Sequence, residues 1–165
     1  MRGSRRLLAA ALAGVLVATP ALSQAVPGVD PLAARVDATD ARRFARLFEA
    51  AGGKPSAAAL QAGYLAGAGR GVEIFTPGRI GTAENLAEAV AADPDRYAYA
   101  IRTCLPLVDG LAAEMRAVYL GFRELLPDRP LPQVHVVFGA GNSGGTAAPD
   151  AQVLGLEVMC GPGTT

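Results

Sequence analysis

The last thirty residues constrain the fold most, because they hold the apolar stretches that are patterned as strands. We predict one strand over residues 133–138 and a second over residues 152–159, joined by an open, glycine-rich loop over residues 139–150. Both strands carry apolar residues on both faces, which is typical of strands inside a larger sheet. A two-stranded hairpin is only marginally stable in water. We therefore expect a sheet that is incomplete in this sequence and is covered by the helices that precede it.

Residues 40–125 are patterned as helices, so the predicted fold class is α+β, with several helices packed on a small, incomplete β-sheet. The longest helical segment, residues 93–125, has an apolar residue at every third or fourth position. Pro106 lies inside this segment, and we expect a kink or a short break there because proline removes a backbone donor. The candidate N-cap residues of the helices are Asp40, Ser56, Thr82 and Asp93.

Residues 1–25 have the features of an export signal. Three arginines precede an apolar run from Leu7 to Ala18, and small residues surround the expected cleavage point after Ala25. The run is shorter than the roughly 20 residues that span a bilayer as a helix, so we expect no stable membrane anchor after cleavage. The protein is therefore predicted to be periplasmic or secreted, by either the general or the twin-arginine route. Residues 26–38 are predicted to be a loose leader, and residues 39–165 a single domain, incomplete at its C-terminus.

Charge and cysteine content limit the possible partners and the redox state. After signal cleavage the chain carries 12 basic and 15 acidic side chains, a net charge of 12 − 15 = −3. This balance argues against nucleic-acid binding, which needs a basic excess. Export permits a disulfide between Cys104 and Cys160, which would stabilise the fold by about 3–4 kcal/mol. Two buried free thiols are an equal alternative.

Three features near the C-terminus could carry chemistry. Residues 141–145 (Gly-Asn-Ser-Gly-Gly) match the signature of chymotrypsin-like serine proteases, but that nucleophile needs a histidine and a carboxylate. The single histidine, His135, lies only eight residues earlier, so a glycine turn is the favoured interpretation. For His135 itself, a hydrogen-bonded strand residue is favoured over a metal ligand. Glu157 is either a functional carboxylate with a raised pKa or the partner of an arginine, and both interpretations stay open.

Several segments resemble a family of bacterial exported proteins described as predicted zinc-dependent proteases, otherwise a domain of unknown function. The glycine loop flanked by two apolar strands is the most specific part of this resemblance. The matching segments are residues 52–56 (Gly-Gly-Lys-Pro-Ser) with Leu60 and Tyr64, residues 76–80 (Thr-Pro-Gly-Arg-Ile), residues 136–139 (Val-Val-Phe-Gly), residues 141–147 (Gly-Asn-Ser-Gly-Gly-Thr-Ala) and residues 154–157 (Leu-Gly-Leu-Glu).

The resemblance implies a zincin-like N-terminal portion that is truncated before its active site. In such proteins a helix carrying H-E-x-x-H follows the second strand, and its histidines bind zinc. This sequence does not contain that motif, so the resemblance assigns no catalytic residue and no metal ligand here, and zinc is expected only in a full-length relative. The expected partner is a peptide or protein substrate, and the residues implied in holding it are Asn142, Gly144, Gly145 and Thr146.

The resulting hypothesis is an exported metalloprotease-like protein that lacks its catalytic segment and is itself inactive. The alternative is a complete, non-enzymatic periplasmic binding or interaction module. The sequence leaves open whether the protein is an enzyme.

Overall fold

The computed structural model of the chain describes residues 28–161, which form an α+β fold as predicted. The α-helices are α1 (Thr39–Ala50), α2 (Ala57–Leu60), α3 (Arg70–Phe75), α4 (Ala83–Ala92), α5 (Pro94–Tyr99), α6 (Ala112–Leu125) and α7 (Leu156–Met159). The π-helical turns are η2 (Gln61–Leu65), η3 (Thr76–Ile80) and η4 (Ala100–Cys104), and the 3-10 helices are η1 (Pro31–Ala33) and η5 (Leu105–Leu111). The strands are β1 (Val36–Asp37), β2 (Gln133–Val137), β3 (Gly145–Ala148) and β4 (Ala151–Gly155).

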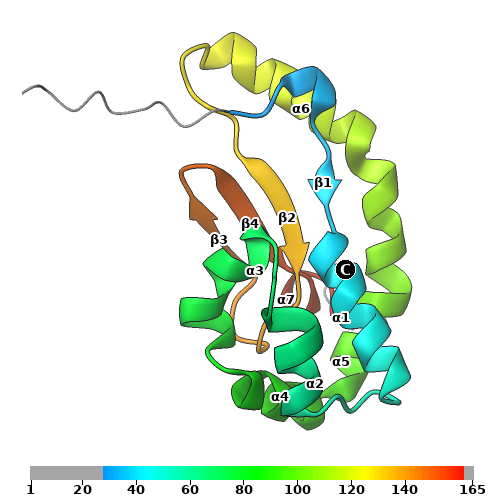
Figure 1. Cartoon of the computed structure of the whole chain (residues 1–165). Helices are drawn as coiled ribbons and strands as arrows, with labels where there is room; N and C mark the ends of the chain where they lie inside the picture. The colour runs from blue at the N-terminus through cyan, green and yellow to red at the C-terminus, as the bar shows by residue number, and fades with distance from the viewer. Residues whose placement is uncertain (1–27, 162–165) are drawn as a thin grey trace, which may run out of the picture.

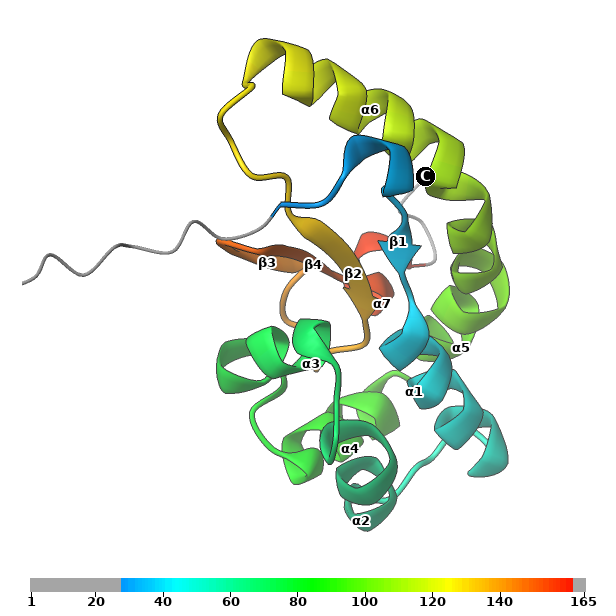
Figure 2. The same cartoon turned by 45° about the horizontal axis from the view of Figure 1, so that its top comes forward.

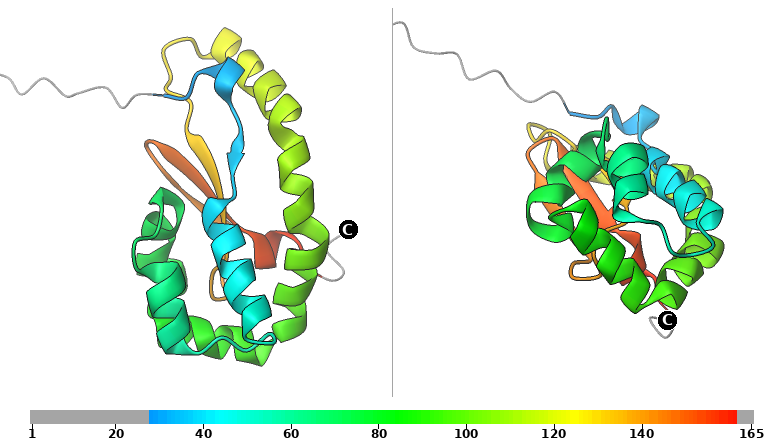
Figure 3. Two further views of the ribbon diagram at one scale, coloured as in Figure 1. Left: turned by 45° about the vertical axis from the view of Figure 1, so that its right-hand side comes forward. Right: turned by 60° about the horizontal axis from the view of Figure 1, so that its bottom comes forward.

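The four strands form one mixed sheet in the order β1-β2-β4-β3 (Figure 1). β2 is parallel to both β1 and β4, with Val136 opposite Leu154, whereas β3 is antiparallel to β4. Both strands with apolar residues on two faces, β2 and β4, are inner strands, which confirms the interpretation of their pattern. Figure 3 shows α2, α3 and α4 grouped together, well apart from α6, which passes along the β1 side of the sheet.

The predicted second strand is too long. Pairing ends at Gly155, and Leu156–Met159 form the short helix α7 instead. A short apolar run does not distinguish a strand from a buried helical turn, because both expose little surface to water. Two tertiary links hold α7: the carboxylate of Glu157 accepts the Gly141 amide, and Cys160 is disulfide-bonded to Cys104.

The predicted open loop is also partly wrong, because its second half is a strand. Gly145–Ala148 pair with β4, and Pro149 and Asp150 are the two residues that connect the strands. The Asp150 carboxylate accepts two hydrogen bonds from the Arg70 guanidinium, at 2.9 and 3.1 Å, and this pair ties the β3–β4 turn to α3.

The predicted loose leader, residues 26–38, is part of the fold from residue 28 onward. It contains η1 and β1, and the Val29 amide donates to the Leu131 carbonyl oxygen at 2.8 Å. A Cβ on Gly28 would lie 2.7 Å from the Leu131 nitrogen, so only glycine allows this approach. The predicted signal, residues 1–25, lies outside the described residues. Within residues 28–161, no helix is both long enough and apolar enough to cross a membrane.

Three of the four predicted N-caps are confirmed. The side-chain oxygens of Ser56, Thr82 and Asp93 each accept the amide three residues further on. Asp40 is not an N-cap, because it lies one residue inside α1. Its carboxylate instead accepts the Gly69 amide at 2.9 Å, a long-range contact that local sequence does not encode.

The long helical segment breaks at the predicted place. Pro106 lies at the start of η5, where the π-helical turn η4 gives way to a 3-10 helix before α6 begins. The first half of the apolar seam is buried and the second half is not, because α6 extends past the body of the protein (Figure 2). The exposed apolar side chains along this segment are Leu107, Leu111, Val118, Leu120, Phe122, Leu125 and Leu126.

An aromatic cluster fills the core at the end of β2. The rings of Phe44 and Phe138 stack with centroids 4.5 Å apart, and Tyr64 meets Phe44 edge-on at 5.3 Å. Tyr97 completes the cluster at 5.8 Å from Phe44. Such pairs are worth about 0.5–1.5 kcal/mol each beyond their buried area, so this cluster fixes where β2 ends and the next loop begins.

Candidate functional site

The candidate site begins at the carboxyl end of β2, where the glycine loop (residues 139–144) leaves the sheet. Two buried tyrosines hold this point. The Tyr64 hydroxyl donates to the Phe138 carbonyl oxygen at 2.8 Å, and the Tyr97 hydroxyl donates to the Gly139 carbonyl oxygen at 2.9 Å. Burial raises the pKa of both tyrosines, so both remain protonated donors at neutral pH.

Glu157 holds the glycine loop through a hydrogen bond to its backbone. Glu157 is 1% exposed, its Oε1 accepts the Gly141 amide at 3.3 Å, and the Gly139 backbone also favours its charged form. Its Oε2 is buried and has no hydrogen-bond partner among the described residues. Burial raises the pKa of this carboxyl, while the two loop amides oppose the rise by favouring the charged form.

The sequence left open whether Glu157 pairs with an arginine, and the structure places backbone amides there instead. Arg96 acts on Glu157 electrostatically, but its ion pair is with Asp93, at 3.0 Å. Glu157 is therefore a buried carboxyl group whose Oε1 is hydrogen-bonded to the loop and whose Oε2 has no hydrogen-bond partner among the described residues.

The loop over Glu157 must be glycine at two positions. A Cβ on Gly139 would lie 2.5 Å from the Phe75 ring, and Gly141 has φ of 72°, which other residues rarely adopt. The glycines thus have a packing reason that is independent of any catalytic signature.

The loop leads directly into β3, which is an edge strand of the described sheet (Figure 1). The Gly155 amide donates to the Gly144 carbonyl oxygen at 3.1 Å, which sets the phase of pairing with β4. Since antiparallel pairing alternates, Gly145 and Ala147 direct their amide and carbonyl groups away from β4. The Ser143 hydroxyl contacts both groups of Gly145, whereas Ala147 is exposed.

The four residues implied in substrate holding lie on this one continuous segment. Asn142 is exposed in the loop, Gly144 closes the first pair with β4, and Gly145 and Thr146 begin the edge strand. Ala147 belongs to the matching segment but was not among the residues implied in holding substrate, although its outward backbone groups are the most exposed ones on β3. Its only sequence signal was the two-residue Pro149–Asp150 turn that makes residues 145–148 a strand.

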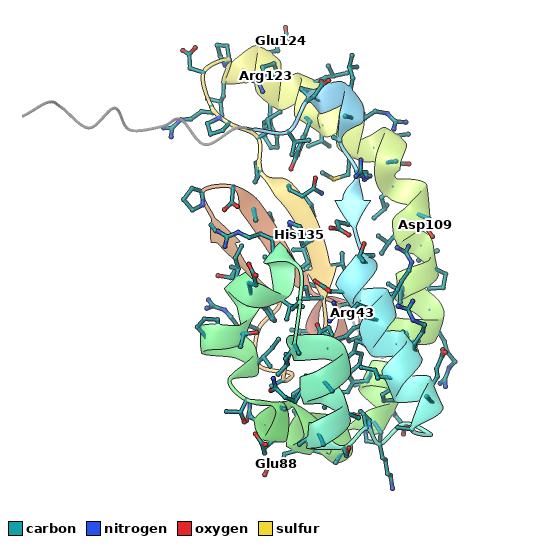
Figure 4. The ribbon with its side chains drawn as sticks, viewed as in Figure 1. Arg43, Glu88, Asp109, Arg123, Glu124 and His135 are labelled. Carbon is teal, nitrogen blue, oxygen red and sulfur yellow. A yellow bond between two sulfur atoms is a disulfide. The ribbon has the colours of Figure 1, made fainter. Side chains whose placement is uncertain are left out.

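Ser143 and His135 do not form a catalytic pair. Among residues 28–161 the hydrogen bonds of the Ser143 hydroxyl are with Gly145. His135 lies on β2 beneath α3, with its Nδ1 3.4 Å from the Asp37 carboxylate (Figure 4). His135 is therefore a strand residue with a carboxylate neighbour.

The residues present do not fit the zinc ion that the resemblance implies for full-length relatives. A zinc site needs three or four convergent nitrogen, sulfur or carboxylate ligands. Within residues 28–161 no three such side chains converge. The Sγ atoms of Cys104 and Cys160 are bonded to each other, so of the two alternatives the structure has the disulfide.

A cleft of about 450 Å³ is lined by residues from the end of α1, the turn that follows it, α5 and η4. Its floor is apolar, with Phe48, Pro94 and Ala98, and its rim carries both charge signs. The rim residues are Glu49, Lys54, Asp95 and Arg102. This mixed rim favours no single ligand class.

Comparisons of the chain with models of protein families, with characterised proteins and with solved structures find no match.

Proposed function

We propose that the protein binds an extended polypeptide along the open edge of β3, as the substrate-holding part of an exported, zinc-metalloprotease-like protein. An added strand gains affinity from main-chain hydrogen bonds to an exposed edge. The observation that carries the proposal is the outward amide and carbonyl of Ala147 on a short edge strand that follows the glycine loop.

The chain contributes binding rather than bond cleavage in this proposal. The H-E-x-x-H segment that holds the metal and activates its water in the full-length relatives does not occur in this sequence, which has a single histidine. The predicted export signal supports a place outside the cytoplasm, and the family resemblance supports a peptide or protein as substrate.

The edge can be tested by removing one donor. Ala147→Pro deletes the outward amide at a position where proline is tolerated, because an edge strand does not need that donor for its own ladder. Ala147→Ser keeps the amide and is the matched control. The probe is fluorescently labelled β-casein, an unfolded protein, and the readout is fluorescence anisotropy.

We expect Ala147→Pro to weaken casein binding at least tenfold, which corresponds to about 1.4 kcal/mol, while Ala147→Ser binds like the wild type. Thermal unfolding of both variants checks that the fold is retained. Equal binding by the two variants would contradict the proposal, as would no binding by the wild type.

A second candidate, the non-enzymatic interaction module, is favoured by a different observation. Val118, Phe122 and Leu125 on α6 are 50%, 46% and 76% exposed and follow one another at three- and four-residue spacing. Contiguous exposed apolar surface marks interaction sites. Light scattering over a range of protein concentrations tests this candidate. Self-association that Val118→Glu abolishes would support it, whereas a monomer at every concentration would contradict it.

A further inference from the structure

We propose that Glu157 is a latch on the glycine loop that loosens as the pH rises and so controls access to the edge of β3. This inference rests on the proposed function for the importance of the edge, but the latch itself can be measured without any bound peptide. It is carried by the geometry of one carboxyl group.

Glu157 connects α7 with the glycine loop through a polar contact. It lies on α7, which the disulfide at Cys160 anchors to η4. Its Oε1 accepts the Gly141 amide from the loop, and the Gly139 backbone also favours its charged form. The loop therefore closes onto an element that is covalently fixed.

When the loop is closed over Glu157, the hydrogen-bonding capacity of the carboxyl group is only partly used. A buried polar atom without a partner costs free energy, and the cost is larger for a charged group. The Oε2 atom of Glu157 is in this position. Opening of the loop would let water reach Oε2, so the charged form of Glu157 favours the open loop and the neutral form favours the closed one.

The groups that face Glu157 do not cancel this effect. On α5, the Arg96 guanidinium favours the charged form of Glu157, but it also forms an ion pair with Asp93. On the same helix, Tyr97 is neutral and donates its hydroxyl hydrogen to the Gly139 carbonyl oxygen. From η2, Tyr64 is neutral and committed to Phe138. α3 contributes the apolar ring of Phe75.

The glycine loop continues directly into the edge strand β3. Only three residues separate Gly141 from Gly145, and Ser143 contacts Gly145 through its hydroxyl group. The carbonyl oxygen of Ser143 would lie 2.5 Å from a Cβ on Gly155, so the loop passes tightly over the end of β4. When the loop leaves Glu157, the start of β3 loses its support.

The direction of the pH effect follows from linkage. The closed state has the raised pKa and the open state has the ordinary pKa, so closing takes up a proton. Opening is therefore rarest below the ordinary glutamate pKa and becomes more frequent as the pH rises through the raised value. Each unit of difference between the two pKa values changes the opening equilibrium tenfold.

The test is amide hydrogen exchange of the loop between pH 4 and pH 8, corrected for the intrinsic exchange rate. We expect the protection of the Gly139 and Gly141 amides in the wild type to fall as the pH rises. In Glu157→Gln, which keeps the Oε1 acceptor but cannot ionise, protection should not depend on pH. Glu88→Gln, at an exposed position on α4, is the control for loss of a carboxylate and should behave like the wild type.

Loop protection that is independent of pH in the wild type would overturn the latch, and this readout needs no variant to fold. The same pH dependence in Glu157→Gln would also overturn it. Failure of casein to bind would contradict the proposed function while leaving the exchange result unaffected, so the two failures are distinguishable.

Discussion

The hydroxyl group of Tyr64 both donates to the carbonyl oxygen of Phe138, at 2.8 Å, and accepts the amide of the same residue, at 2.9 Å. One side chain from the helical layer thus takes the place of a neighbouring strand at the end of β2. Because both backbone groups of Phe138 are satisfied in this way, β2 can stop there and the glycine loop can turn away over Glu157.

Removal of this hydroxyl should destabilise the protein more than a loss of buried area would suggest. Tyr64→Phe leaves the buried amide and carbonyl of Phe138 without their partner, which costs about 1–3 kcal/mol for such groups. Urea unfolding measures the loss. Tyr99→Phe is the matched control, since Tyr99 is only partly buried. Equal midpoints for the two variants would show that the Phe138 groups do not depend on Tyr64.

Reduction of the disulfide should lower stability strongly. The bond joins residues 56 positions apart, and closing a loop of that length in the unfolded chain is worth about 4 kcal/mol in the entropic model. Urea unfolding with and without a phosphine reductant measures the effect. The Cys104→Ser/Cys160→Ser variant should be as unstable as the reduced protein and insensitive to reductant. An unchanged midpoint on reduction, with free thiols verified by mass spectrometry, would contradict the prediction.

Glu157→Gln should alter stability in a pH-dependent way. The folded-state pKa of Glu157 is raised by burial, so its contribution is most favourable below the ordinary pKa and is lost as the pH rises through the folded value. The melting temperature of the variant relative to wild type should therefore increase from pH 4 to pH 8. Differential scanning calorimetry measures this difference, and a decrease over the same range would have the wrong sign.

Two neighbouring aromatic residues on α6 should respond very differently to truncation. Tyr119 is 5% exposed and donates to the Pro132 carbonyl oxygen, whereas Phe122 is 46% exposed. Tyr119→Ala should cost about 3 kcal/mol, as is usual for buried aromatic residues, and Phe122→Ala less than about 1 kcal/mol. Chemical unfolding of the two variants provides the comparison, and similar losses would mean that the outer face of α6 is covered in solution.

Features that depend on a few adjacent residues could be predicted from the sequence. The N-caps Ser56, Thr82 and Asp93 need only an oxygen and an amide three residues away. The break at Pro106 needs only the missing amide of proline. The inner position of β2 followed from apolar residues on both of its faces.

Features that depend on distant partners could not be predicted. Asp40 resembles an N-cap locally, but its acceptor role is toward Gly69. The segment Leu156–Met159 resembles a strand, but Glu157 and Cys160 are held by contacts with the glycine loop and η4. The short strand β1 is recognisable only from its parallel partner in β2, because two residues carry no periodicity.

The arrangement of the candidate site depends on distant partners in the same way. The resemblance implied Asn142, Gly144, Gly145 and Thr146 in holding substrate, and the structure places these residues on one segment that leads into an edge strand. The outward position of Ala147 depends on its register with Gln152 in β4, and no local pattern in the sequence encodes that register.

The central claim, that an extended polypeptide adds to β3, is tested most directly by hydrogen exchange at the Ala147 amide. The protein would be measured alone and with saturating β-casein. The account predicts that casein slows exchange at Ala147 at least tenfold, because this amide gains a main-chain acceptor, while the Thr146 and Ala148 amides, which already face β4, change little. Unchanged exchange at Ala147 under conditions where casein is bound would contradict the account.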